Sequence, residues 1–108
     1  MTPKEFKKFQ LRDKHCPHCG ATGEMLVPHH RKNRGMGGSP KIAKLPSNIL
    51  SVCAEINGLM ESDSEWAEKA RTYGWKLSSW QDPQVVPVYD AITTFWFRLD
   101  NNYQRKAI

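Results

Sequence analysis

The spacing of two cysteines in the stretch CPHCG, residues 16–20, constrains the fold of this chain more than any other feature. Two residues separate Cys16 from Cys19, and a proline and a glycine favour a tight turn around them. This spacing lets both sulfurs bind one metal ion. A chain of 108 residues builds a single modest core, which a metal cross-link would stabilise. We therefore predict one domain, residues 1–108, with a metal-binding turn near its N-terminus.

Composition argues against a membrane protein and favours an anionic partner. No apolar run approaches the roughly 18 residues that a membrane span requires, and the segment from Met1 to Lys14 is polar and basic, unlike a secretory signal. We expect a cytoplasmic protein, in which cysteines are metal ligands or free thiols more often than disulfide partners. Sixteen lysines and arginines against eleven acidic residues suit DNA or RNA, although a solvated surface gives the same balance.

The N-terminal half contains patterns for a helix, two extended segments and a loop. Residues 2–11, TPKEFKKFQL, predict a short amphipathic helix. Residues 24–31, EMLVPHHR, predict a strand. A basic segment over 31–46 is interrupted by glycines and prolines, which predicts a loop. The apolar stretch SNILSVC, residues 47–53, predicts a short turn or strand.

The C-terminal half begins with the clearest helix. In SDSEWAEKARTYG, Ser62 as N-cap and Glu65 three residues later form a predicted capping box, and Gly74 ends the helix. An earlier helical turn is predicted to begin at Asn57. The tail from Trp75 contains the runs GWKL, VVPV and FWFRL, which predict two or three antiparallel strands.

Further chemistry-bearing residues follow the cysteine pair in order. His29 and His30 end the predicted strand, GMGGS occupies 35–39, Asn48 lies in LPSN, and Asn57 follows nine residues later. Each feature alone is common in unrelated proteins. The ordered set resembles the HNH endonuclease family, also called His-Me finger or ββα-metal nucleases, and particularly its small bacteriophage-encoded members.

This resemblance covers about residues 12–77. It implies an α+β fold with a small ββα-metal core, an N-terminal helix and cysteine knuckle, and a C-terminal antiparallel β extension over about 78–108. It also implies a metal-dependent enzyme that hydrolyses DNA phosphodiester bonds to 5′-phosphate and 3′-hydroxyl ends.

The resemblance also assigns roles to individual residues. His30 corresponds to the general base that activates water, and His29 to the first metal ligand, since adjacent strand residues point to opposite sides. Asn48 corresponds to the residue that holds the loop carrying the base. Asn57 corresponds to the last metal ligand, and Glu61, four residues on, could reach the same ion directly or through water. An amide oxygen favours Mg²⁺ or Mn²⁺, with other transition metals left open.

The basic residues beside the histidines suggest contact with DNA. Arg31, Lys32 and Arg34 could hold backbone phosphates, which would give affinity with little sequence information. A solvated loop is the alternative interpretation of the same residues.

The chain departs from the family in its zinc ligands and its last catalytic ligand. Many members hold a structural zinc with two CxxC pairs, but here the second has the sequence CAEIN, which keeps Cys53 and has Ile56 in place of the fourth thiol. Either His15 or His18 completes the set, or the zinc site is lost and the thiols pack as small apolar groups. Asn57 replaces the usual histidine and predicts weaker metal binding.

These departures leave two alternatives to an active endonuclease. In the first, the HNH fold serves as a catalytically weak or inactive DNA-binding or accessory module, for example with phage terminase and other packaging proteins. In the second, the histidines are ordinary strand-end residues and the cysteines core thiols or a zinc knuckle.

Overall fold

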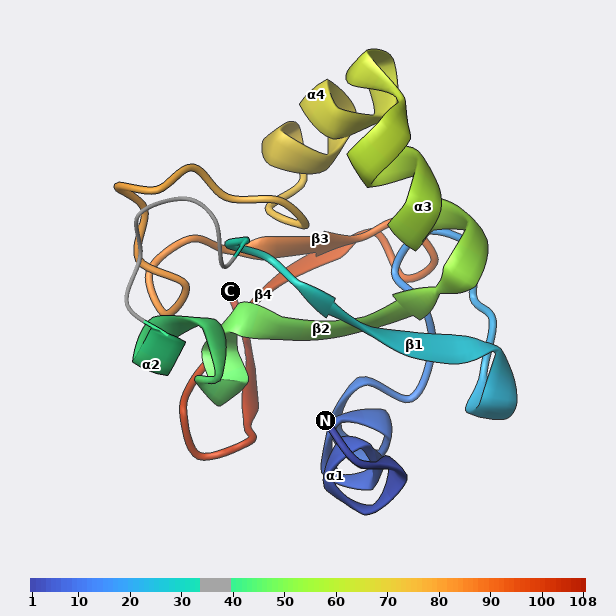
Figure 1. Ribbon diagram of the computed structural model, residues 1–108, viewed down its shortest axis with the longest axis vertical. Helices are drawn as coiled ribbons and strands as arrows, with labels where there is room; N and C mark the ends of the chain where they lie inside the picture. The colour runs from blue at the N-terminus through green and yellow to red at the C-terminus, as the bar shows by residue number, and fades with distance from the viewer. Residues whose placement is uncertain (34–39) are drawn as a thin grey trace.

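Two small antiparallel sheets and four α-helices make up the part of the chain that the computed structural model describes, residues 1–33 and 40–108 (Figure 1). The α+β class predicted from the sequence is confirmed. None of the described helices has the length and apolar character needed to cross a bilayer.

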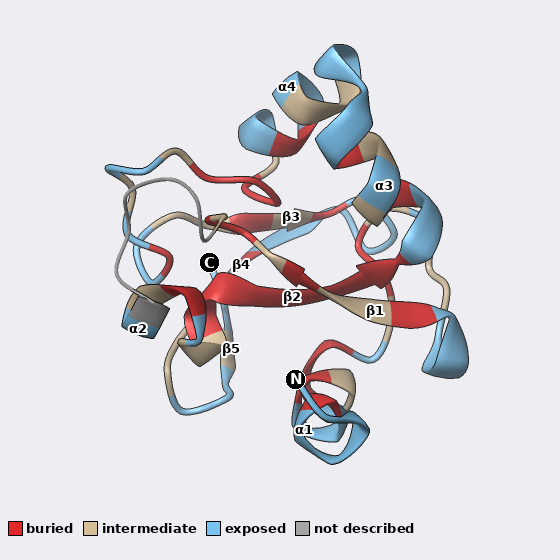
Figure 2. Ribbon diagram, in the orientation of Figure 1, coloured by how far each residue is buried: buried red, intermediate tan, exposed pale blue. Residues whose placement is uncertain are grey.

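The first sheet pairs β1 (Leu26–His30) with β2 (Ile49–Cys53), and the register runs from Leu26 opposite Cys53 to His30 opposite Ile49. Helix α1 (Pro3–Asp13) packs against β2, and α3 (Ala54–Ser62) packs against both strands. Every residue of β2 is buried (Figure 2). SNILSVC is therefore a core strand, preceded by a 3₁₀ turn over Pro46–Asn48.

The N-terminal helix α1 (Pro3–Asp13) matches the predicted amphipathic segment and continues two residues further. Thr2 caps it, since its hydroxyl accepts a hydrogen bond from the Glu5 backbone N–H at 3.2 Å. Phe6 and Phe9 form its buried face. A 3₁₀ turn, Gly23–Met25, leads into β1, and the short helix α2 (Pro40–Ala43) precedes the turn before β2.

The predicted capping box at Ser62 is wrong. Helix α3 begins at Ala54, before the predicted turn at Asn57, and continues through Ser62. Helix α4 (Ser64–Thr72) is capped by Asp63, whose Oδ1 accepts hydrogen bonds from the two exposed backbone N–H groups of its first turn at 2.9 and 3.2 Å. A carboxylate satisfies these N–H groups as well as a hydroxyl does, so the cap lies one residue later than predicted.

The second sheet has the order β3 (Val88–Asp90), β4 (Phe95–Leu99) and β5 (Arg105–Ala107), all antiparallel. The predicted strand at FWFRL is thus confirmed in full, and the one at VVPV only in part, since its last residue, Val88, begins β3. GWKL forms no strand, because the backbone N–H groups of Trp75 and Lys76 both donate to a carbonyl of α4. The third strand is the polar edge segment RKA, which lacks the apolar alternation that predicts a strand.

Candidate functional site

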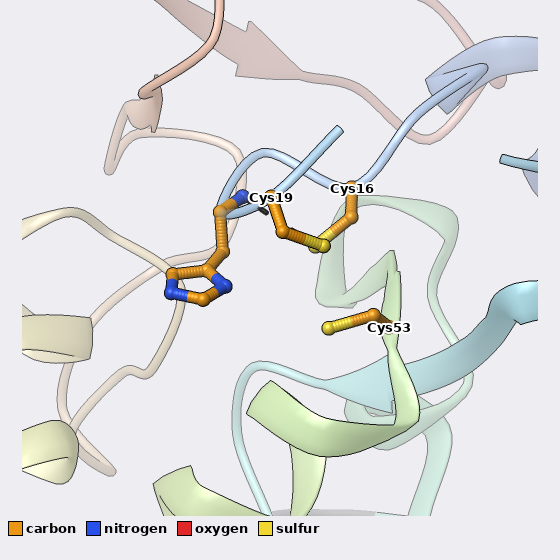
Figure 3. Close-up of side chains that lie close together, drawn as sticks. Cys16, Cys19 and Cys53 are labelled. Atoms are coloured by element: carbon orange, nitrogen blue, oxygen red, sulfur yellow. Dashed lines mark hydrogen bonds between the residues drawn. The ribbon is translucent and has the colours of Figure 1, made fainter. Parts of the chain in front are cut away.

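Three cysteines from two distant segments converge beside the start of α3 (Figure 3). Cys16 and Cys19 lie on the turn after α1, which closes through a hydrogen bond from the Gly20 N–H to the Cys16 carbonyl at 2.9 Å. Cys53 is the N-cap of α3. Together with His18, their metal-ligating atoms all lie within 4.8 Å of one another. These four residues, called the Cys3His cluster below, can hold a metal ion such as zinc.

His18 is the fourth member that the sequence left undecided. Its ring lies edge-on to Trp66 and Trp75, with centroids 4.9 and 5.9 Å away. Its Nδ1 is buried and has no hydrogen-bond partner in the described part of the chain. His15 instead bonds a carboxylate oxygen of Asp90 at 2.6 Å. A donor set of three sulfurs and one imidazole fits tetrahedral zinc, so the thiols do not need a second CxxC pair.

Burial disfavours the thiolate form of two of these cysteines, Cys16 and Cys53. It raises the pKa of Cys16 to about 11, and it also raises the pKa of Cys53. Both are therefore thiols at neutral pH, and binding of a metal would release their protons.

A second group of side chains lies near the opposite end of β1. His29 is buried, and burial lowers its pKa to about 4, so its ring is neutral at pH 7. Its Nε2 lies 2.7 Å from the Trp75 carbonyl oxygen, and its Nδ1 lies 3.1 Å from Oδ1 of Asn57. Because a carbonyl only accepts, the single ring proton is on Nε2 and the Nδ1 lone pair faces Asn57.

Glu61 lies one turn beyond Asn57 on α3, and its charge acts on His29. One carboxylate oxygen is 3.5 Å from Nζ of Lys76, and the other accepts from the Asn33 amide at 3.5 Å. Lys76 is a largely buried cation that sequence analysis missed. The structure thus brings together His29, Asn57 and Glu61, called the His29–Asn57 site below.

His30 is half-buried and lines a different hollow, of about 250 Å³, with residues from α1 and with Lys44. This matches the expectation that the two histidines point to opposite sides of the strand. The His30 ring belongs to the same strand end as His29 but to a separate surface.

Asn48 is completely buried and connects both flanks of the basic loop. Its Oδ1 accepts from the Lys32 backbone N–H at 2.8 Å, and its Nδ2 donates to the carbonyls of Lys32 and Ala43 at 3.2 Å each. Its backbone carbonyl accepts from the Arg31 N–H at 2.8 Å. The side-chain amide therefore fixes the backbone of Lys32, two residues after His30, to the end of α2.

Arg31 requires a correction, because its guanidinium faces inward. It is fully buried and donates to the backbone carbonyls of Gly74, Ser47, Pro83 and Val86 at 2.8–3.0 Å. Burial lowers its pKa to about 9, which leaves it charged at pH 7. Its guanidinium N–H groups donate to carbonyls inside the protein, so the predicted phosphate contact of Arg31 is wrong.

Of the other two predicted phosphate ligands, the structure describes only Lys32. Lys32 is largely buried and lines a hollow beside Trp80. Arg34 and the GMGGS stretch lie outside the described residues.

No family model, curated protein or solved structure matches this chain. The Cys3His cluster and the His29–Asn57 site are therefore the features of this chain that point to a function.

Proposed function

We propose that this chain is a metal-dependent HNH DNA endonuclease that leaves 5′-phosphate and 3′-hydroxyl ends. The observation that carries the proposal is the 3.1 Å approach of His29 Nδ1 to Asn57 Oδ1, on the strand that also carries His30. In this proposal β1, β2 and α3 form a ββα-metal core, since they follow one another in that order and α3 packs on both strands.

The donor set at the His29–Asn57 site fits a divalent cation. Two lone pairs that face one another are unfavourable unless a cation lies between them or the amide turns its NH₂ group toward the ring. The Trp75 carbonyl fixes the ring orientation as outer ligands of metal-bound histidines do. His29, Asn57 and Glu61 would hold the ion, and a nitrogen with hard oxygen donors suits Mg²⁺, Mn²⁺ or a related metal. When bound, such an ion would stabilise charge on the scissile phosphate.

The remaining residues of the strand end position or move protons. His30 is assigned the removal of a proton from the attacking water, for which a neutral imidazole is suited near neutral pH. Asn48 keeps the backbone after His30 in place through its three side-chain hydrogen bonds. Lys76 adds a positive charge beside Glu61 that favours a bound phosphate.

In this account the Cys3His cluster binds a structural zinc. It would join the turn after α1 to the first residue of α3, since Cys53 caps that helix. Asn57 lies one turn further along α3, so a zinc-bound cluster would hold the start of the helix that carries the catalytic ligand.

A non-catalytic DNA-binding or packaging accessory with the same fold is the second candidate. Asn57 favours it, because an amide can pair with His29 directly and without an ion by turning its NH₂ group to Nδ1. The two candidates predict the same DNA binding and opposite results for cleavage.

A supercoiled-plasmid assay separates them. Zinc-loaded wild type and His30→Ala are compared without added metal and with Mg²⁺, Mn²⁺ or Ni²⁺, and thermal melting and DNA binding confirm that the variant is folded. We expect metal-dependent cleavage by the wild type and at least a roughly hundredfold loss in His30→Ala. A folded wild type that binds DNA and cuts with none of these metals would contradict the endonuclease and favour the accessory module.

A further inference from the structure

An exposed tryptophan lies on the segment between α4 and β3, which runs beside α2 (Figure 1). Trp80 is 84% exposed. Indole rings usually bury most of their surface, and tryptophan is enriched at interaction sites, where its ring supplies a large contact area. Neither the proposed metal site nor the core uses this side chain.

Both ends of the short loop that carries Trp80 are anchored to the residue after His30. The Leu77 backbone N–H donates to the Arg31 carbonyl at 2.8 Å, and the Arg31 guanidinium donates to the Pro83 carbonyl at 2.8 Å. The buried arginine therefore fixes the position of the Trp80 loop relative to the proposed catalytic strand end.

The loop is also ordered internally. The Gln81 N–H donates to the Ser78 carbonyl at 3.1 Å, and the Ser78 N–H donates to Oε1 of Gln81 at 2.8 Å. Trp80 lies inside this turn, three residues from Leu77, so their Cα atoms are at most about 11 Å apart. Successive bases in duplex DNA rise about 3.4 Å along each strand. The Trp80 backbone is thus within a few nucleotide spacings of the Arg31 backbone, one residue after His30.

The surroundings of Trp80 combine apolar and polar groups, as a surface that holds both a base and its backbone does. The indole borders a hollow of about 370 Å³ that is also lined by the largely buried cation Lys32, by the amide side chains of Gln81 and Gln84, and by the apolar residues Ile42, Leu45 and Pro83. One carboxylate, Asp82, is present, and its Oδ1 accepts from the Gln84 backbone N–H at 2.9 Å. A flat ring beside a cation and amides is the combination that stacks a base and contacts its backbone.

We propose that Trp80 stacks on an unpaired base of the DNA strand held at the His29–Asn57 site, so that the protein prefers DNA with single-stranded character near the cut. This inference deepens the proposed function and rests on it for the position of the scissile bond. Stacking itself requires no catalysis, and the two claims can therefore fail separately.

The test measures binding of a fluorescein-labelled single-stranded oligonucleotide by anisotropy, with zinc-loaded protein and no added Mg²⁺ or Mn²⁺. Wild type is compared with Trp80→Ala, Trp80→Phe and the control Phe95→Ala, which removes an aromatic ring that is 68% exposed on β4. A second oligonucleotide carries 2-aminopurine, whose fluorescence falls when the base stacks.

We expect Trp80→Ala to raise Kd at least about fivefold and to abolish the 2-aminopurine quenching. Trp80→Phe should stay within about threefold of wild type and Phe95→Ala within about twofold, since one retains a stacking ring and the other leaves the loop intact. Unchanged binding by Trp80→Ala, or an equal loss in Phe95→Ala, would overturn the proposal. A change of oligomeric state without a change in DNA binding would also overturn it, in favour of a protein contact. If the expected binding results are obtained but the wild type cleaves no DNA, only the proposed endonuclease activity is refuted.

Discussion

The Cys3His cluster and the His29–Asn57 site share helix α3 but differ in chemistry and enclosure. Cys53 caps the start of the helix, and Asn57 and Glu61 follow on later turns. The cluster offers three soft sulfurs and an imidazole, a complete tetrahedral set. The His29–Asn57 site offers one imidazole nitrogen and hard oxygens, a set that in the proposed function would leave coordination positions for water and phosphate. Under the proposed function, this difference corresponds to a division of labour, with stability depending on the first group and chemistry on the second.

The largest expected effect comes from the cluster. Cys16→Ser should remove bound zinc and lower the free energy of unfolding by at least about 4 kcal/mol, or roughly 20 °C in melting temperature, because metal binding is coupled to folding. Metal analysis and thermal melting followed by circular dichroism measure both. Asn57→Ala on the same helix is the matched control and should keep its zinc and most of its stability. Similar losses in both variants would break the proposed division.

Arg31 is a further test of the division between stability and chemistry. It follows His30 directly in the sequence, yet its buried guanidinium stabilises the fold. Arg31→Lys keeps the charge but loses the planar fork that reaches four carbonyls, so we expect a loss of at least about 2 kcal/mol in urea unfolding. The exposed Lys44→Arg serves as control and should change stability by less than about 0.5 kcal/mol. If Arg31→Lys unfolds like wild type, the internal role of Arg31 is refuted.

The burial of Arg31 also illustrates what sequence patterns could and could not predict. Side chains two apart on an extended chain share a face, so the burial of His29 implies the burial of Arg31. The carbonyls that Arg31 contacts come from three separate segments, and no local pattern reports them. The prediction that Arg31 contacts phosphate rested only on its place in the sequence beside His30.

The Cys3His cluster and the His29–Asn57 site were predictable to different degrees. Cys16 and Cys19 followed from thiol chemistry and spacing and Cys53 from the family resemblance, whereas the choice of His18 over His15 depended on tertiary packing against Trp66 and Trp75. The proximity of His29 and Asn57 was expected from the family resemblance. The sequence gives no indication that Lys76 belongs to this site, because a lysine after a tryptophan is common. Only the folded chain, in which Lys76 follows the end of α4, brings its Nζ near Glu61.

Asn48 should affect both properties moderately. Asn48→Ala leaves buried backbone groups of Lys32 and Ala43 without partners, so we expect a loss of about 2 kcal/mol. Cleavage measured well below the melting temperature should also fall, because the backbone after His30 loses its anchor. A variant as stable as wild type, with undiminished cleavage, would show that the amide has neither role.

Glu61 should have the smallest effect on stability and a clear effect on cleavage. Glu61→Gln removes a charge beside His29 and should lower the cleavage rate about 10–100-fold with the melting temperature nearly unchanged. Glu55→Gln, on the exposed first turn of the same helix, is the matched control and should cut normally. Equal cleavage rates for the two variants would remove Glu61 from the site.

Manganese binding to zinc-loaded protein, followed by electron paramagnetic resonance, tests the separation of the two groups most directly. Both samples are bound to a short DNA duplex and carry His30→Ala, which is expected to prevent cleavage. The second sample also carries Asn57→Leu. Our account predicts a single bound Mn²⁺ that Asn57→Leu abolishes while the zinc content stays the same. Mn²⁺ binding that is equal in both proteins, or that occurs only when zinc is displaced from the cysteines, would contradict it.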